Sequence, residues 1–213
     1  MSSEAVARTT IPSAILLIGP TAAGKTPLGN LLEARGVNGR RCVHFDFGDH
    51  LRQAAAGSGY ASALTPEELN VVRRVLQAGA LLQDGEFGIA AAILKAFMTD
   101  RNRDASALIV LNGLPRHEGQ SRALESVVNV VLLANLHCTA DTVWRRILMN
   151  TGGDRTNRED DTLEAVTKRL GLYRESTLPL MQYYENCGVH CLGIEIGVET
   201  TTEQILARTT WPL

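Results

Sequence analysis

LLIGPTAAGKTPLGNLLEARG, residues 16–36, joins an apolar run to a helical pattern through a glycine-rich loop. Residues 19–26 satisfy G-x-x-x-x-G-K-[ST], with a predicted strand before and a predicted helix after, the context of a phosphate-binding loop (P-loop). In such a loop, backbone N–H groups surround phosphate oxygens, the lysine reaches the outer phosphates and the last hydroxyl faces a magnesium ion. A tight turn with a solvated lysine is the alternative, but it does not explain why both flanking elements fit. The stretch therefore predicts that a nucleoside triphosphate is bound by Gly19, Thr21, Ala22, Ala23, Gly24, Lys25 and Thr26.

Further apolar runs predict the rest of a sheet. They cover residues 14–18, 41–45, 107–111, 127–134 and 189–194, and helical patterns lie between them. This alternation is expected of buried parallel strands with helices on both faces, so the fold class is α/β.

Composition excludes several classes of protein. The chain has 213 residues, of which 45% are hydrophobic and 21% charged, and a formal net charge of −2. No apolar run approaches the roughly 20 residues of a membrane span, and there is no basic excess for nucleic acid. Four scattered cysteines fit no standard metal hairpin. We expect a soluble cytoplasmic protein that binds neither membrane nor nucleic acid.

Two connections are longer than simple crossovers. The first lies between residues 49 and 97 and has room for two helices. One helix begins with a capping-box pattern at Thr65 and Glu68 and ends at Gly79, and its apolar face is formed by Val71, Val72, Val75 and Leu76. A second helix follows Asp84. Residues 149–160 are polar, basic and glycine-containing, and predict a mobile lid loop. After it, Asp161 and Glu164 are spaced as a capping box for a helix that buries Leu163, Val166, Leu170 and Tyr173.

Four stretches resemble, in order and spacing, the signatures of the adenylate kinase family of nucleoside monophosphate (NMP) kinases. They are HFDFGDHLR (44–52), QAGALLQDGEF (77–87), LNGLPRHEGQ (111–120) and REDDTLEAVTKRLGLYRESTLPLMQYY (158–184). The resemblance spans residues 14–207 and implies a P-loop NTPase three-layer fold with a five-stranded parallel sheet, an NMP-binding helical insertion and a short lid. Residues 1–13 are expected to be a flexible lead, and 14–213 one domain with core segments 14–48, 87–148 and 161–213, insertion 49–86 and lid 149–160. No zinc is expected, because the four-cysteine lid of some relatives is absent.

The resemblance also implies roles for individual residues. The NMP site of the family is matched by Phe47, Arg52, Leu82, Gly113, Arg116 and Gln120. An ATP-binding position is matched by Arg146, and the arginines that close over the transferred group are matched by Arg158 and Arg169. The resemblance implies that the catalytic residues are Lys25, Arg116, Arg158 and Arg169. It also implies that a magnesium ion is bound by Thr26 directly and by Asp49 through water. Arginine suits this chemistry because its planar, always charged fork positions phosphates and stabilises the in-line transition state. Arg146 or Arg169 taken alone is more simply explained as a solvated or ion-paired surface group, whereas Arg116 directly follows an apolar strand, where parallel sheets bind ligands. Asp49 is as easily a helix N-cap.

Four positions depart from the family. Asn112 stands where the family usually has an aspartate. Phe47 stands where the family has a small residue near the acceptor base. Asn150 stands where the family has a lid arginine, and Arg155 could supply that missing positive charge. The loop GPTAAGKT lacks a glycine after its proline and one between Lys25 and threonine. The sequence of this loop also resembles the P-loop of tRNA dimethylallyltransferases, but none of the later stretches supports membership of that family.

These observations predict a monomeric, magnesium-dependent kinase of nucleotide metabolism that transfers the γ-phosphoryl group of ATP to an NMP, with AMP first. A kinase for CMP, UMP, a dNMP or another small phosphate acceptor remains open because of Phe47. A nucleotide-binding regulator with reduced catalysis remains open because of Asn112 and Asn150.

Overall fold

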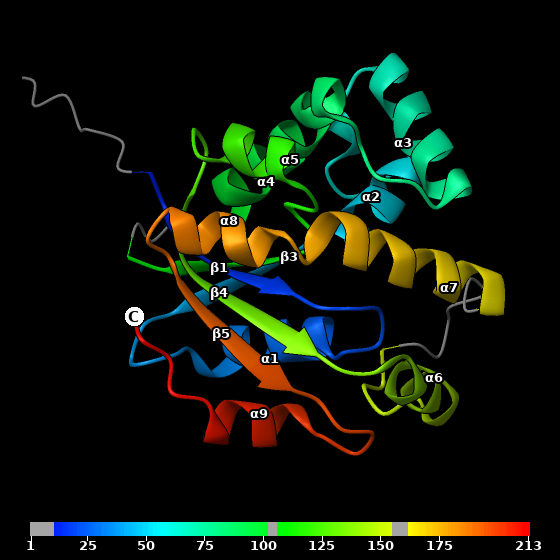
Figure 1. Cartoon of the computed structure of the whole chain (residues 1–213). Coiled ribbons are helices and arrows are strands. Elements are labelled where there is room, and N and C mark those ends of the chain that lie inside the picture. The colour runs from blue at the N-terminus through cyan, green and yellow to red at the C-terminus, as the bar shows by residue number, and fades with distance from the viewer. Residues whose placement is uncertain (1–10, 102–105, 155–161) are drawn as a thin grey trace, which may run out of the picture.

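A computed structural model describes residues 11–101, 106–154 and 162–213. Its centre is a five-stranded sheet in the order β2-β3-β1-β4-β5, and every neighbouring pair is parallel (Figure 1). The strands are β1 (Ser13–Ile18), β2 (Cys42–Asp46), β3 (Leu108–Asn112), β4 (Asn129–His137) and β5 (His190–Glu195). The predicted α/β class and all five predicted strands are confirmed.

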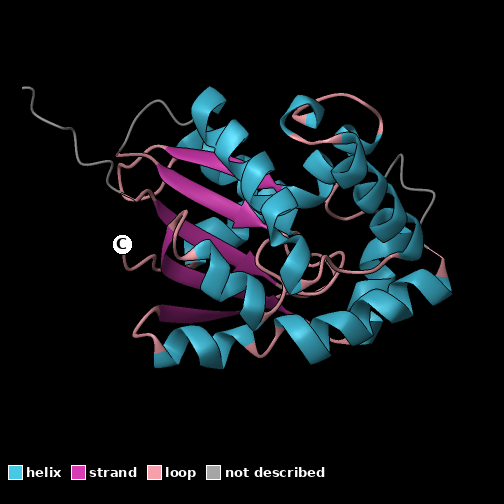
Figure 2. Ribbon diagram, turned by 90° about the horizontal axis from the view of Figure 1, so that it is seen from above, coloured by secondary structure: helices cyan, strands magenta, loops and turns pink. Residues whose placement is uncertain are grey.

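Helices surround this sheet on both faces (Figures 1 and 2). They are α1 (Lys25–Arg35), α2 (Phe47–Ala55), α3 (Pro66–Ala78), α4 (Phe87–Arg101), α5 (Glu118–Leu124), α6 (Ala140–Met149), α7 (Leu163–Leu172), α8 (Leu180–Asn186) and α9 (Thr202–Arg208). Short 3₁₀ turns cover Ala61–Ala63 and Asp84–Glu86, and a π-helical turn, Tyr173–Thr177, joins α7 to α8.

Alternate side chains of each strand enter two separate cores, because successive residues of a strand point to opposite faces. In β1, Leu16 and Ile18 pack with Phe97 of α4 and Leu180 of α8. Ile15 and Leu17 enter the other core, which includes Leu28 and Leu32 of α1 and Ile205 of α9. Burial on both faces explains why the strands read as continuous apolar runs.

The predicted insertion between β2 and α4 contains α2 and α3, which stand together at one end of the molecule (Figure 1). Thr65 and Glu68 form the expected capping box, and Gly79 closes α3 with φ 55°. Val72 and Val75 are buried, so the predicted face and caps of α3 are confirmed.

The predicted lid begins where α6 ends, and Asn150 caps that helix with φ 47°. Residues 155–161, most of the predicted lid, lie outside the described residues, as do Asp161 and residues 1–10. The next helix is capped by Thr162, whose hydroxyl accepts from Ala165 N at 3.2 Å. Val166 is buried as predicted, but Leu163 is 66% exposed, because the first turn of α7 projects beyond the sheet (Figure 1).

Among the residues described, no helix combines the length and apolar character needed to cross a membrane.

Candidate active site

One cleft lies at the carboxyl ends of β1, β2 and β3, where parallel sheets place their ligands. The P-loop follows β1 and forms one end of it, through Gly19, Thr21, Ala22, Gly24, Lys25 and Thr26. The other end is formed by all six predicted NMP-site residues, Phe47, Arg52, Leu82, Gly113, Arg116 and Gln120. Arg169 of α7 also lines the cleft. Segments far apart in sequence are thus brought together at one cleft.

Backbone sterics fix the P-loop. A Cβ on Gly19 would lie 2.5 Å from the carbonyl oxygen of Leu136, and Gly24 has φ 95°. Ala22 adopts φ 61°, although it has a side chain. The loop therefore requires glycine at 19 and 24 and holds one alanine in a left-handed conformation. Ala23 is fully buried beneath the loop.

The ammonium group of Lys25 lies inside this loop. Its Nζ donates to the carbonyl oxygens of Gly19 at 2.8 Å and Pro20 at 2.7 Å. Lys25 is also the first residue of α1, whose N-terminus carries partial positive charge. The donor end of the cleft therefore presents a fixed cation beside a helix N-terminus, as an anion site requires.

A polar cluster of Thr26, Asp46 and Asn112 lies next to Lys25. Thr26 Oγ1 donates to Asp46 Oδ2 at 2.6 Å, and Asn112 Nδ2 donates to the same oxygen at 2.9 Å and to Thr26 Oγ1 at 3.0 Å. Burial raises the pKa of Asp46, but the hydrogen bonds from Thr26 and the backbone of Asp49 outweigh it, so the net pKa is lowered. A carboxylate is thus held ionised beside the P-loop hydroxyl.

Asp46 was missed from the sequence, although it ends an apolar strand, where polar side chains reach the crevice. It also caps α2, because its Oδ1 accepts from Asp49 N at 3.0 Å. The interpretation of Asp49 as the N-cap is therefore wrong. Asp49 instead faces Arg52, at 3.3 Å, and Gln53, at 2.7 Å, with half of its side chain exposed.

At the acceptor end, Gln120 joins two loops. Its Nε2 donates to the carbonyl oxygen of Leu82 at 3.0 Å, and its Oε1 accepts from Arg116 N at 2.8 Å. Those two bonds use one donor and one lone pair of an amide that has two of each, so the group can still contact a base. Gly113, with φ 83°, lets the chain turn from β3 into this loop.

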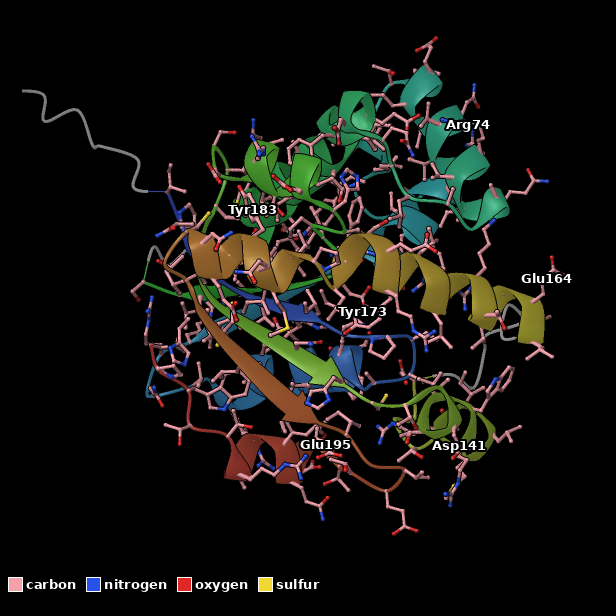
Figure 3. All side chains as sticks on the ribbon, viewed as in Figure 1. Arg74, Asp141, Glu164, Tyr173, Tyr183 and Glu195 are labelled. Carbon is pink, nitrogen blue, oxygen red and sulfur yellow. The ribbon has the colours of Figure 1, made fainter. Side chains whose placement is uncertain are left out.

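Arg116 lines the acceptor end of the cleft. Burial, and then the positive charge of Arg169, lower its pKa. Thr177 Oγ1 donates to the carbonyl oxygen of Arg116 at 2.9 Å. Tyr173, labelled in Figure 3, begins the π-helical turn and donates to Asn135 of β4 at 2.8 Å. The π-helical turn thus anchors Arg116 beside the helix that carries Arg169. Two guanidinium groups held close together favour an anionic ligand.

Arg146 does not line the cleft but supports the P-loop from behind. It is 3% exposed, and burial lowers its pKa. Its Nε donates to the carbonyl oxygen of Ala22 at 2.8 Å. Its Nη1 contacts the carbonyl oxygens of Gly197, Val198 and Thr200 at 2.8, 3.1 and 3.0 Å. Arg158 and Arg155 lie outside the described residues.

Comparison with known proteins agrees with this geometry. No protein-family model matches the chain. The chain is 30% identical over 202 residues to an adenylate kinase of Synechococcus sp. strain RCC307, with 91% of this chain and 96% of the relative covered. It is 32% identical over 204 residues to that of Synechococcus sp. strain WH7803, with 91% and 94% covered. A UMP-CMP kinase 1 of Oryza sativa subsp. japonica is 24% identical over 177 residues, with 82% and 64% covered.

Similarity at this level extends over 91% of the chain. The chain belongs to the adenylate kinase family and is a nucleoside monophosphate kinase, a phosphotransferase with a phosphate group as acceptor.

Proposed function

We propose that the protein transfers the γ-phosphoryl group of ATP to AMP, with magnesium, and forms two molecules of ADP. The observation that carries this proposal is that the P-loop and the acceptor residues Arg52, Arg116 and Gln120 line a single cleft. One nucleotide at each end would have its phosphates facing those of the other.

Catalysis would come from position and charge. Lys25 and the P-loop N–H groups would hold the donor phosphates, Arg52 and Arg116 the acceptor phosphate, and Arg169 the charge between them. The acceptor phosphate is already anionic at neutral pH, so no general base is needed. Holding both reactants in one geometry replaces a bimolecular encounter by an oriented transfer. Arg158 keeps its predicted donor-side role as part of this proposal, whereas Arg146 would act on the donor end by holding the P-loop in place.

The residues beside Lys25 fit a magnesium ion. Thr26 supplies a hydroxyl and Asp46 a carboxylate, and both are the hard oxygen donors that magnesium prefers, directly or through water. The ion would supply neutralisation of charge on the phosphates. Asp49, with its carboxylate directed to Arg52 and Gln53, would contribute through water.

AMP is proposed over other acceptors because Phe47 is part of the core. Phe47 is 4% exposed, and its ring stacks on that of Phe45 with centroids 6.0 Å apart. A phenyl ring carries no hydrogen-bonding group, so polar reading of the base is left to Gln120 and to the loop that ends at Leu82, both of which line the cleft. The similarity to adenylate kinases points the same way, whereas the more distant UMP-CMP kinase makes pyrimidine acceptors the competing outcome.

A panel of acceptors tests the proposal. Purified protein, ATP and magnesium are combined with AMP, GMP, CMP, UMP and the dNMPs, and ADP formation is followed in a coupled assay. We expect kcat/KM for AMP to exceed every other value by at least about tenfold. A higher value for CMP or UMP would replace the acceptor. Tight ATP binding without phosphorylation of any NMP would favour a nucleotide-binding regulator.

The control is Lys25→Met, prepared in the same way. We expect it to lower turnover by about a thousandfold or more, because the fixed cation is lost where phosphate charge develops. Its unfolding temperature should stay within a few degrees of the wild type. Turnover equal to that of the wild type would show that another kinase contaminates both preparations, or that Lys25 has no such role.

We also propose that the enzyme acts as a monomer in the cytoplasm, since one chain supplies both ends of the cleft. Light scattering after size-exclusion chromatography would contradict this if it gave a dimer whose dissociation abolished activity.

A further inference from the structure

The cluster of Asp46, Asn112 and Thr26 contains one carboxylate, and its position is informative. Asp46 ends β2 and Asn112 ends β3, and the two are direct partners in the parallel register. Both side chains reach Thr26, at 2.6 Å from Asp46 and 3.0 Å from Asn112. Neighbouring strands lie about 4.8 Å apart, so either position can place a side chain beside the P-loop hydroxyl.

P-loop enzymes hold magnesium with the hydroxyl of the loop and a carboxylate from a neighbouring strand. An amide is a poorer partner for metal-bound water, because its nitrogen cannot accept a hydrogen bond and its oxygen carries no full charge. β3, which lies directly beside β1, ends in an amide here, and the carboxylate that contacts Thr26 comes from β2 instead.

We propose that Asp46 is the carboxylate of the magnesium site, placed one strand away from Asn112, and that Asn112 positions it. The inference rests on the proposed function, since it assigns the metal of that reaction to a particular side chain.

The contacts explain why 112 is an amide. Asn112 Nδ2 donates to Asp46 Oδ2 at 2.9 Å, whereas a second carboxylate at this place would face the first without a proton between them. Asn112 is 4% exposed, so the repulsion would be weakly screened. Aspartate at 46 and asparagine at 112 are therefore mutually consistent, and the absence of an acid from β3 is compensated.

The contacts also separate Asp46 from Asp49. The carboxylate of Asp49 is directed to Arg52 and Gln53 on its own helix, and half of its side chain is exposed. Asp46 Oδ2 accepts a hydrogen bond directly from the hydroxyl of Thr26. Asp46, and not Asp49, is thus the carboxylate in contact with the P-loop hydroxyl.

Metal affinity tests the proposal without turnover. Protein in excess over a β,γ-imido analogue of ATP is titrated with Mn²⁺, and free Mn²⁺ is followed by electron paramagnetic resonance. We expect Asp46→Asn to weaken Mn²⁺ binding by about 10- to 100-fold. The exchange Asp46→Asn with Asn112→Asp returns one carboxylate to the cluster, and we expect it to restore the affinity to within a few fold.

Asparagine and serine cap helices as well as aspartate does, so α2 should form in Asp46→Asn and, as a second variant, in Asp46→Ser. Circular dichroism and analogue binding without metal verify the fold. Asp141→Asn, on the exposed first turn of α6 (Figure 3), removes the same charge from a residue outside the cluster and should leave the affinity unchanged.

Wild-type Mn²⁺ affinity in folded Asp46→Asn and Asp46→Ser would overturn the proposal. So would a loss in Asp49→Asn as large as that in Asp46→Asn, because the role would then belong to Asp49. Failure of the exchange to recover affinity would contradict the equivalence of the two strand ends. These results do not depend on which NMP is phosphorylated, so the panel of acceptors can fail while this assignment holds, and the reverse.

Discussion

The two ends of the cleft differ in how their cations are held. At the donor end, Lys25 donates to two carbonyl oxygens of the P-loop, and Arg146 fixes Ala22 from behind. At the acceptor end, half of the Arg52 side chain is exposed, and its guanidinium contacts Asp49, three residues earlier on the same helix.

This difference indicates that the donor end is preorganised for nucleotide binding, because its cationic side chains are hydrogen-bonded to the backbone of the P-loop. The position of Arg52 depends on α2, which stands together with α3 in the insertion at one end of the molecule (Figure 1). Arg116, also at the acceptor end, is anchored by Thr177 and lies close to Arg169. Substitutions at each end, from the largest expected effect to the smallest, test whether this contrast is real.

Arg116→Ala should have the largest effect. It removes a charge-assisted contact from the acceptor end of the cleft, so we expect a loss of about 4 kcal/mol of transition-state stabilisation, close to a thousandfold in kcat/KM for the NMP. The measurement is steady-state kinetics with the acceptor varied. Arg122→Ala, an exposed arginine on α5, is the matched control and should behave as the wild type. Normal kcat/KM in Arg116→Ala would remove Arg116 from the acceptor site.

Arg146→Ala should mainly affect the donor end. It leaves the carbonyl oxygens of Ala22, Gly197, Val198 and Thr200 without their guanidinium donor, so we expect a loss of about 3 kcal/mol in the free energy of unfolding and weaker ATP binding. Urea denaturation and calorimetry measure these quantities. Arg145→Ala, the exposed neighbour, should change neither. Wild-type stability with weakened ATP binding would mean that Arg146 contacts the nucleotide directly.

Phe47→Leu distinguishes a core residue from a base-stacking one. If the ring fills the core, the free energy of unfolding falls by about 1 kcal/mol and the order of preference among NMPs stays the same. The acceptor panel and thermal unfolding provide both results. A tenfold selective loss of AMP turnover at unchanged stability would show that the ring contacts the base.

Ala22→Gly should have the smallest effect and the opposite sign. The left-handed backbone costs an alanine about 1–2 kcal/mol, whereas glycine adds about 0.4–1 kcal/mol of chain entropy to lose on folding. We therefore expect a net gain of about 0.5 kcal/mol in stability, measured by urea denaturation. A destabilisation of about 1 kcal/mol would show that Arg146 holds the loop without strain.

Much of this molecule follows from local sequence. The apolar runs predicted all five strands, the pattern around Thr65 predicted the cap of α3, and the P-loop motif predicted that a helix follows the loop. Such features depend on residues a few positions apart, so a short stretch of sequence contains the physical cause. The acceptor residues were predicted by their resemblance to a family.

Only the tertiary structure decided which side chains meet across the sheet. Thr26 is 20 residues from Asp46 and 86 from Asn112, and the parallel register brings the three together. Asp46 was missed, and Asp49 was considered as the N-cap, because the sequence did not show that β2 passes directly into α2. Leu163 has the spacing of a buried residue, but it is 66% exposed because its turn of α7 extends past the sheet. Sequence alone determined the elements and the donor loop, since local forces make them, whereas the carboxylate beside that loop was decided by strand pairing.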